Sequence, residues 1–126
     1  MNNLKDYVRQ WENNGDFSFK SFWLMFGTFL DEIYNKKDIN MIEEEPFENS
    51  NIPKEIKAFI AASVDYLSNQ MNKKAPIWVF KKEYSLENPY FPSKLKGDIR
   101  AVMCIESPIE YKSKNIFVLA NVLSRC

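Results

Sequence analysis

The residue types that most often carry catalysis are scarce in this sequence. Histidine is absent, which excludes a Ser-His-Asp triad, a Cys-His pair and any zinc site built on imidazole. The commonest acid–base side chain near neutral pH is therefore missing. Carboxylates, lysine or tyrosine could still serve an enzyme, but no glycine-rich phosphate loop and no metal-ligand spacing is present. We expect a protein without catalytic activity, metal ion or cofactor.

The acids and thiols in the chain lack the spacing of a metal or redox site. Glu43, Glu44 and Glu45 are consecutive, and adjacent side chains do not converge on one cation. We interpret this stretch as a solvated linker rather than a Mg²⁺ or Ca²⁺ site. Cys104 and Cys126 have no Cys-x-x-Cys spacing, so we expect free thiols, the first buried and the second exposed.

Four basic residues in the C-terminal part could bind nucleic acid: Arg100, Lys112, Lys114 and Arg125. Together with Tyr111 and Phe117 they could hold a single strand by charge and base stacking. We favour the competing interpretation, in which the lysines are solvated residues of a turn. Seventeen basic and seventeen acidic residues give a formal net charge of zero, so the whole chain exerts no pull on a phosphate backbone.

Three amphipathic helices are predicted in the first part of the chain, and they must carry the core. Residues 2–14 place apolar side chains on one face, with Gly15 just past the helix end. Residues 19–36 carry a broad aromatic stripe behind a Ser18 N-cap, which is typical of a central helix of a bundle or of one that faces a partner. Residues 53–74 give the clearest helical spacing and contain small residues that allow close helix contact.

The rest of the chain is less regular. Residues 38–52 are predicted as a connection, and residues 75–98 as an irregular proline-rich segment packed on the bundle through Trp78. Residues 99–106 and 116–123 each fit either a short helix or a buried strand. An alternative architecture pairs three short strands in a small sheet, at residues 77–80, 101–105 and 116–119. We predict a mainly α fold, one helical domain spanning residues 1–126.

Composition supports a globular cytosolic protein. Hydrophobic residues make up 45% of the chain and aromatic residues 15%, which argues against intrinsic disorder. No apolar run reaches the roughly 18 residues that a membrane span needs. The first ten residues contain lysine, aspartate and arginine and lack the apolar core of a signal peptide. We therefore expect a cytoplasmic location and no membrane association.

An ordered series of motifs in the second half suggests a family. After Trp78 come Asn88-Pro89-Tyr90-Phe91, Ile99-Arg100-Ala101, Glu106-Ser107-Pro108 and Lys114-Asn115-Ile116-Phe117-Val118. Residues 53–125 resemble a family of small uncharacterised bacterial proteins, which carries arginine at the position of Lys114. The resemblance implies an association with regulatory or toxin–antitoxin-like genes and a protein-binding role. It implies no catalytic residue.

We therefore expect a bacterial, non-enzymatic module that binds a protein partner, or a second copy of itself, in a regulatory or antitoxin-like role. A nucleic-acid-associated protein that uses a C-terminal basic patch is the alternative. The residues predicted to contact a partner are Trp78, Tyr90, Phe91, Arg100, Lys112, Lys114 and Asn115. The sequence leaves open whether Lys114-Asn115 is a surface turn or a polar fastening of the C-terminal segment.

Overall fold

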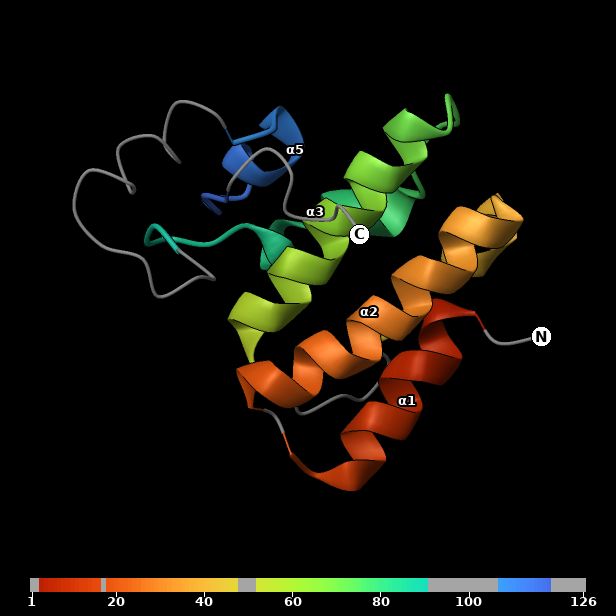
Figure 1. Cartoon of the computed structure of the whole chain (residues 1–126). Helices are drawn as coiled ribbons and strands as arrows, with labels where there is room; N and C mark the ends of the chain where they lie inside the picture. Colours follow the sequence, from red (N-terminus) through yellow and green to blue (C-terminus); the bar gives the residue numbers. More distant parts are fainter. Residues whose placement is uncertain (1–2, 17, 48–51, 91–106, 119–126) are drawn as a thin grey trace.

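The computed structural model describes residues 3–16, 18–47, 52–90 and 107–118, and these residues are mainly helical. The elements are α1 (Leu4–Asn14), α2 (Phe19–Lys36), the 3₁₀ helix η1 (Ile39–Ile42), α3 (Lys54–Gln70), the 3₁₀ helices η2 (Ile77–Phe80) and η3 (Lys82–Tyr84), and α5 (Ile109–Lys112). Among the described elements α1, α2 and α3 are the longest helices, and Figure 1 labels them together with the short α5. The prediction of a small, mainly α domain is confirmed.

The ends of α1 and α2 follow from local hydrogen bonds that the sequence predicts. Asn3 Oδ1 accepts from the backbone N–H of Asp6 at 3.0 Å, and the Asp6 carboxylate accepts from the N–H of Asn3 at 3.2 Å. This capping box satisfies two N–H groups that have no partner within the helix. Gly15 ends α1 with φ 72°, where a side chain would be strained. Ser18 caps α2 by accepting from the N–H of Ser21.

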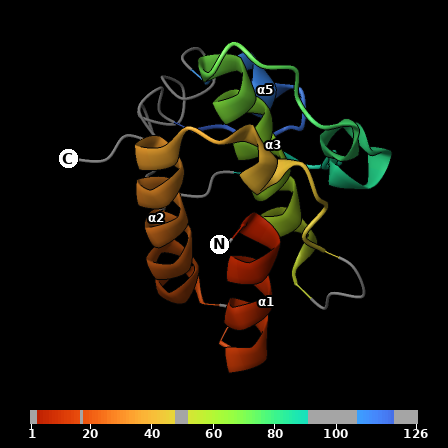
Figure 2. The ribbon, with the colours of Figure 1, turned by 90° about the vertical axis from the view of Figure 1, so that its right-hand side faces the viewer.

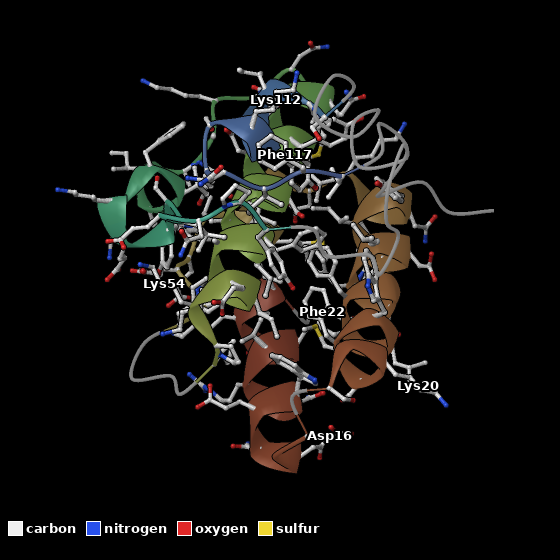
Figure 3. All side chains as sticks on the ribbon, turned by 90° about the vertical axis from the view of Figure 1, so that its left-hand side faces the viewer. Asp16, Lys20, Phe22, Lys54, Lys112 and Phe117 are labelled. Atoms are coloured by element: carbon white, nitrogen blue, oxygen red, sulfur yellow. The ribbon has the colours of Figure 1, made fainter. Side chains whose placement is uncertain are left out.

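Aromatic rings of α2 form the centre of the core. Phe22, Phe26 and Phe29 are almost completely buried, and Figure 3 shows Phe22 in the interior, among the long helices. The Phe22 ring lies 5.8 Å from that of Trp11 on α1 and 5.7 Å from that of Phe59 on α3, both edge to face. Because such pairs add to the free energy of simple burial, one helix joins the other two through its rings.

Helix α3, rather than α2, contacts most of the other elements. Its side chains meet α5, η2 and η3, whereas α2 packs chiefly on α1. Small residues of α3 are completely buried, and they allow the close approach that the sequence predicts: Ala58, Ala61, Ala62 and Ser63. The helix ends at Gln70, before the predicted Lys74, because Asn72 takes the left-handed conformation at φ 55°. The N–H of Lys73 then donates to the carbonyl of Ser68 at 2.9 Å, which closes a Schellman motif.

Residues 77–80 form η2, so the predicted alternative of a small sheet is wrong at that segment. In the described part of the chain the only pairing of the β type is a parallel bridge between Tyr90 and Ile116. The connection over residues 38–52 also differs from the prediction, because it contains the helical turn η1. Asp38 caps this turn, and Met41 and Ile42 within it are buried. The predicted element at residues 99–106, both cysteines and residues 119–123 lie outside the described residues.

Residues 86–90 and 114–118 are joined by backbone hydrogen bonds, and we call this pair of segments the C-terminal seam. The N–H of Leu86 donates to the Lys114 carbonyl at 3.1 Å, and the N–H of Tyr90 donates to the Asn115 carbonyl at 2.9 Å. The N–H of Phe117 then donates to the Tyr90 carbonyl at 2.9 Å. The seam is joined to η2 by the hydrogen bond from the Lys114 side chain to the Val79 carbonyl.

Candidate functional site

Trp78 lies in the core. Only 6% of its surface is exposed, and its indole N–H donates to the Ile42 carbonyl at 3.2 Å. Its ring packs edge to face on Phe47 and Tyr84. Trp78 therefore anchors η2 to the bundle, as the sequence predicts, and this position leaves little surface for a partner.

Tyr90 and Asn115 hold the C-terminal seam together. Tyr90 is half-buried, and its backbone makes two of the seam hydrogen bonds. Asn115 adopts φ 67° and donates from its side-chain amide to the Leu86 carbonyl at 3.2 Å. Asparagine tolerates this left-handed conformation better than most residues. The backbone of Tyr90 and the side chain of Asn115 therefore have a structural task in the seam.

Lys114 is a buried lysine, against the prediction of a solvated turn. Only 4% of its surface is exposed. Its ammonium group donates to the Val79 carbonyl and lies 5.9 Å from the centre of the Phe80 ring. Burial lowers the pKa of Lys114, and the Asp65 carboxylate opposes this effect. Lys114-Asn115 is therefore the polar fastening of the C-terminal segment, and it holds η2 in place.

The basic residues predicted for nucleic-acid binding do not form a described patch. Lys112 lies on α5, half-buried (Figure 3), while the Lys114 ammonium group is used internally. Arg100 and Arg125, like the predicted contact residue Phe91, lie outside the described residues.

A buried polar cluster connects α3 with α5. Asn69 donates from its side chain to Glu110 at 3.2 Å, and both Asp65 and Glu110 are 9% exposed. Burial raises the pKa of Asp65, as does Glu110, while Lys114 opposes the shift. The ammonium group of Lys114 thus offsets part of the cost of burying the Asp65 carboxylate. Within the described residues, no group of three or more potential ligands could hold a metal ion.

The most exposed apolar side chains of η2 are Ile77 and Phe80, at 86% and 63% exposure. A 3₁₀ helix has three residues per turn, so these two side chains lie on the same side of η2. Lys73 and Lys74 precede the pair, Lys82 follows it, and all three are exposed. We call these five residues the η2 surface. Figure 2 shows η2 on the opposite side of α3 from α2.

Sequence reasoning missed the exposure of Ile77 and Phe80, because it treated residues 77–80 as one packed run. A signal was present in the string "KKAPIWVFKK", in which a lysine pair stands on each side of the apolar residues. Such flanking charges are typical of a segment whose ends are in water.

A hollow of about 760 Å³ opens beside η3, and we call it the lysine-lined hollow. Its walls come from α1, the connection before α3, the first turn of α3, and η3: Lys5, Glu44, Glu45, Phe47, Ile52, Lys54, Lys57, Lys81, Glu83 and Tyr84. Two ion pairs span it, Lys5–Glu44 at 2.9 Å and Lys81–Glu45 at 2.6 Å. The predicted solvated linker therefore has two of its carboxylates bound to lysines far away in the chain.

Glu45 accepts hydrogen bonds from two side chains of this hollow, Lys81 and Tyr84. Burial acts to raise its pKa, but hydrogen bonds from Lys81 and Tyr84 outweigh that effect, and the net shift is downward. Glu45 is therefore ionised at neutral pH and offsets the charge of Lys81. Tyr84 has its pKa raised by burial and by the same hydrogen bond.

Comparisons with protein-family models, curated proteins and solved structures find no match to this chain. The resemblance of residues 53–125 to a bacterial family stays a prediction. Among the described residues, no helix has the length and apolar character needed to cross a lipid bilayer.

Proposed function

We propose that this protein is a protein-binding module whose η2 surface docks an acidic, partly apolar segment of a partner. The observation that carries the proposal is the exposed pair Ile77 and Phe80 between exposed lysines. Exposed neighbouring apolar side chains with a polar rim are typical of interaction sites. The proposal includes a regulatory or antitoxin-like role in a bacterial cytosol, which the sequence resemblance and the composition support.

The charge around the pair supports an acidic partner. Lys73, Lys74 and Lys82 are each within four residues of Ile77 or Phe80, a reach of roughly 14 Å at most even for an extended chain. Complementary charge steers a partner toward the surface and selects against basic segments. The partner segment would set its apolar side chains on Ile77 and Phe80 and its carboxylates near the lysines.

The size of the apolar pair supports a protein segment rather than a membrane. Complete burial of an isoleucine or phenylalanine side chain contributes about 1.5–3 kcal/mol each. That amount suits the centre of a protein contact, where a few residues dominate affinity. Stable attachment to a bilayer needs a larger apolar face or a second anchor.

Photo-crosslinking in the native host tests the proposal. A benzophenone amino acid replaces Phe80 in one variant and Leu24 in a matched control, because Leu24 is an equally exposed apolar residue (68%) on α2. We expect a protein cross-linked from position 80 and not from position 24, at a peptide that carries both acidic and apolar residues. Cross-linking to lipid or nucleic acid, or to a basic peptide, would contradict the proposal.

The cross-linked peptide, made synthetically, then gives the quantitative test. I77S/F80S should weaken its binding by about tenfold or more, a loss of about 1.4 kcal/mol, while L24S should leave the affinity unchanged. Raising NaCl from about 50 to about 200 mM should weaken binding to the wild type, since salt screens the charge component. Equal affinity for wild type and I77S/F80S would rule out η2 as the docking surface.

A further inference from the structure

The lysine-lined hollow has the size and the wall chemistry of a small-ligand site. Its volume of about 760 Å³ falls within the roughly 300–1,000 Å³ of pockets that hold small molecules. Four separate segments of the chain build it, and the two ion pairs connect residues 39 and 36 positions apart. The hollow is therefore a product of the fold, with two ion pairs in its wall.

Apolar and aromatic side chains form one part of the wall. Phe47, Ile52 and Tyr84 line the hollow, and each is at most 5% exposed. The rings of Phe47 and Tyr84 lie 5.4 Å apart, and both pack on Trp78 behind them. Only a small part of each side chain is open to the hollow, and because the rings are fixed from behind, that part forms a narrow and rigid apolar floor.

Charged side chains form the other part, with four lysines against three glutamates. Glu44 and Glu45 pair with Lys5 and Lys81, and the charge of Lys57 also acts on Glu45. Lys54 and Lys57 are three residues apart, which places them on the same side of the first turn of α3. Both ammonium groups would attract an anion placed between them, and the net formal charge of the wall is positive.

Two features of this wall are unfavourable for the empty protein, and an anion would relieve both. Lys54 and Lys57 stand at the positive end of the α3 dipole, where cations are disfavoured. Pro53, the N-cap residue, provides no side-chain hydrogen bond to the first turn. These features add to the cavity and its lysines, which carry the inference.

We propose that the hollow binds an organic anion, with a carboxylate or phosphate group at Lys54 and Lys57 and an apolar body over Phe47, Ile52 and Tyr84. This site is separate from the η2 surface, and it does not depend on the protein-binding function. Recognition requires both parts of the ligand, because the lysines alone are exposed to competing salt and water.

The test uses four probes in amide-resonance titrations by NMR: phenyl phosphate, 3-phenylpropionate, benzylamine and inorganic phosphate. We expect at least one aromatic anion to bind saturably with a Kd below about 1 mM, with shifts at Phe47, Tyr84 and the first turn of α3. The tighter of the two aromatic anions identifies the head group as phosphate or carboxylate. Benzylamine, which has the ring but the opposite charge, should not bind.

Charge reversal locates the site. K54E/K57E should weaken binding of the aromatic anion by about tenfold or more, and it keeps a first turn that suits the helix dipole. K20E/K37E is the matched control, with two exposed lysines outside the hollow. Figure 3 shows Lys20 and Lys54 on opposite sides of the molecule. This control should change the affinity less than about twofold.

Three results would overturn the proposal. Neither aromatic anion binds up to about 10 mM; benzylamine binds as tightly as the anions; or K54E/K57E keeps the wild-type affinity. Inorganic phosphate that binds as tightly as phenyl phosphate would show that the apolar wall makes no contribution, which also contradicts it. None of these results bears on I77S/F80S, so this proposal and the docking proposal fail separately.

Discussion

Removal of the Ser63 hydroxyl should destabilise the protein, and a second deletion should restore part of the loss. The oxygens of Ser63 and Tyr111 lie 2.7 Å apart, and both residues are completely buried. This bond joins α3 to α5 across 48 residues of sequence. It is the only hydrogen bond of the Tyr111 hydroxyl with the part of the chain that the structure describes.

The magnitudes follow from which group is left unsatisfied. In S63A the Tyr111 hydroxyl stays buried without a partner, which costs about 1–3 kcal/mol. In Y111F the Ser63 hydroxyl can turn to the carbonyl four residues earlier in α3, so the loss is about 0.5–1.5 kcal/mol. The double variant leaves neither group unsatisfied. We therefore expect Y111F to destabilise the wild type but to stabilise the S63A variant.

The free energy of unfolding is measured for the wild type, S63A, Y111F and the double variant by urea unfolding, followed by tryptophan fluorescence. The four values are compared only if the m-values are equal. The matched control cycle pairs S63A with Y66F, since Tyr66 carries the same chemical group, packs on Tyr111 at 6.1 Å and has no described bond to Ser63. Its effects should be additive. Additive effects in the S63A/Y111F cycle as well would refute the existence of a stabilising bond between these hydroxyls.

Three further predictions concern charge. K54E should raise the free energy of unfolding by about 0.3–1 kcal/mol at low salt, because glutamate suits the start of α3, and a melting curve with and without added salt measures this. Burial and the hydrogen bond to Glu32 raise the pKa of Tyr7 from 10.0 to about 12, so stability should fall as pH rises from about 10 towards 12; urea unfolding of Y7F should show a shallower fall. In K114M the pKa of Asp65 should rise further, so the free energy of unfolding should fall more steeply as pH rises from about 4 to 7. Urea unfolding over this pH range measures the effect, and K114M/D65N should show a flatter dependence of stability on pH.

Local patterns in the sequence were sufficient for the long helices. The 3.6-residue period placed α1, α2 and α3, and Ser18 and Gly15 marked the boundaries where the structure has them. The end of α3 was predicted four residues too late, because Lys73 and Lys74 resemble a helix end. The terminating residue is Asn72, whose left-handed conformation a sequence pattern does not reveal.

The candidate sites depend on contacts between distant residues, which local patterns do not report. Lys114 was predicted to be solvated because it lies in a turn between apolar segments. It is buried because the Val79 carbonyl, 35 residues away, accepts its hydrogen bond. Ile77 and Phe80 were predicted to be packed. The three-residue turn of η2 instead puts them on an exposed side of the helix, while Trp78 and Val79 lie on a buried side. The hollow combines four segments that no spacing rule connects.

The bond between Ser63 and Tyr111 also sets an order for folding during synthesis. The contacts of α1 with α2 can form as soon as the two adjacent helices exist, whereas the hydrogen bond of Ser63 on α3 must wait for Tyr111, which is made 48 positions later. At about 5–20 residues per second, that interval is about 2–10 s. Throughout it, the side of α3 that will receive α5 lacks its partner. A nascent chain stalled within this interval would expose that side, so synthesis speed through the second half of the gene should affect the yield of folded protein.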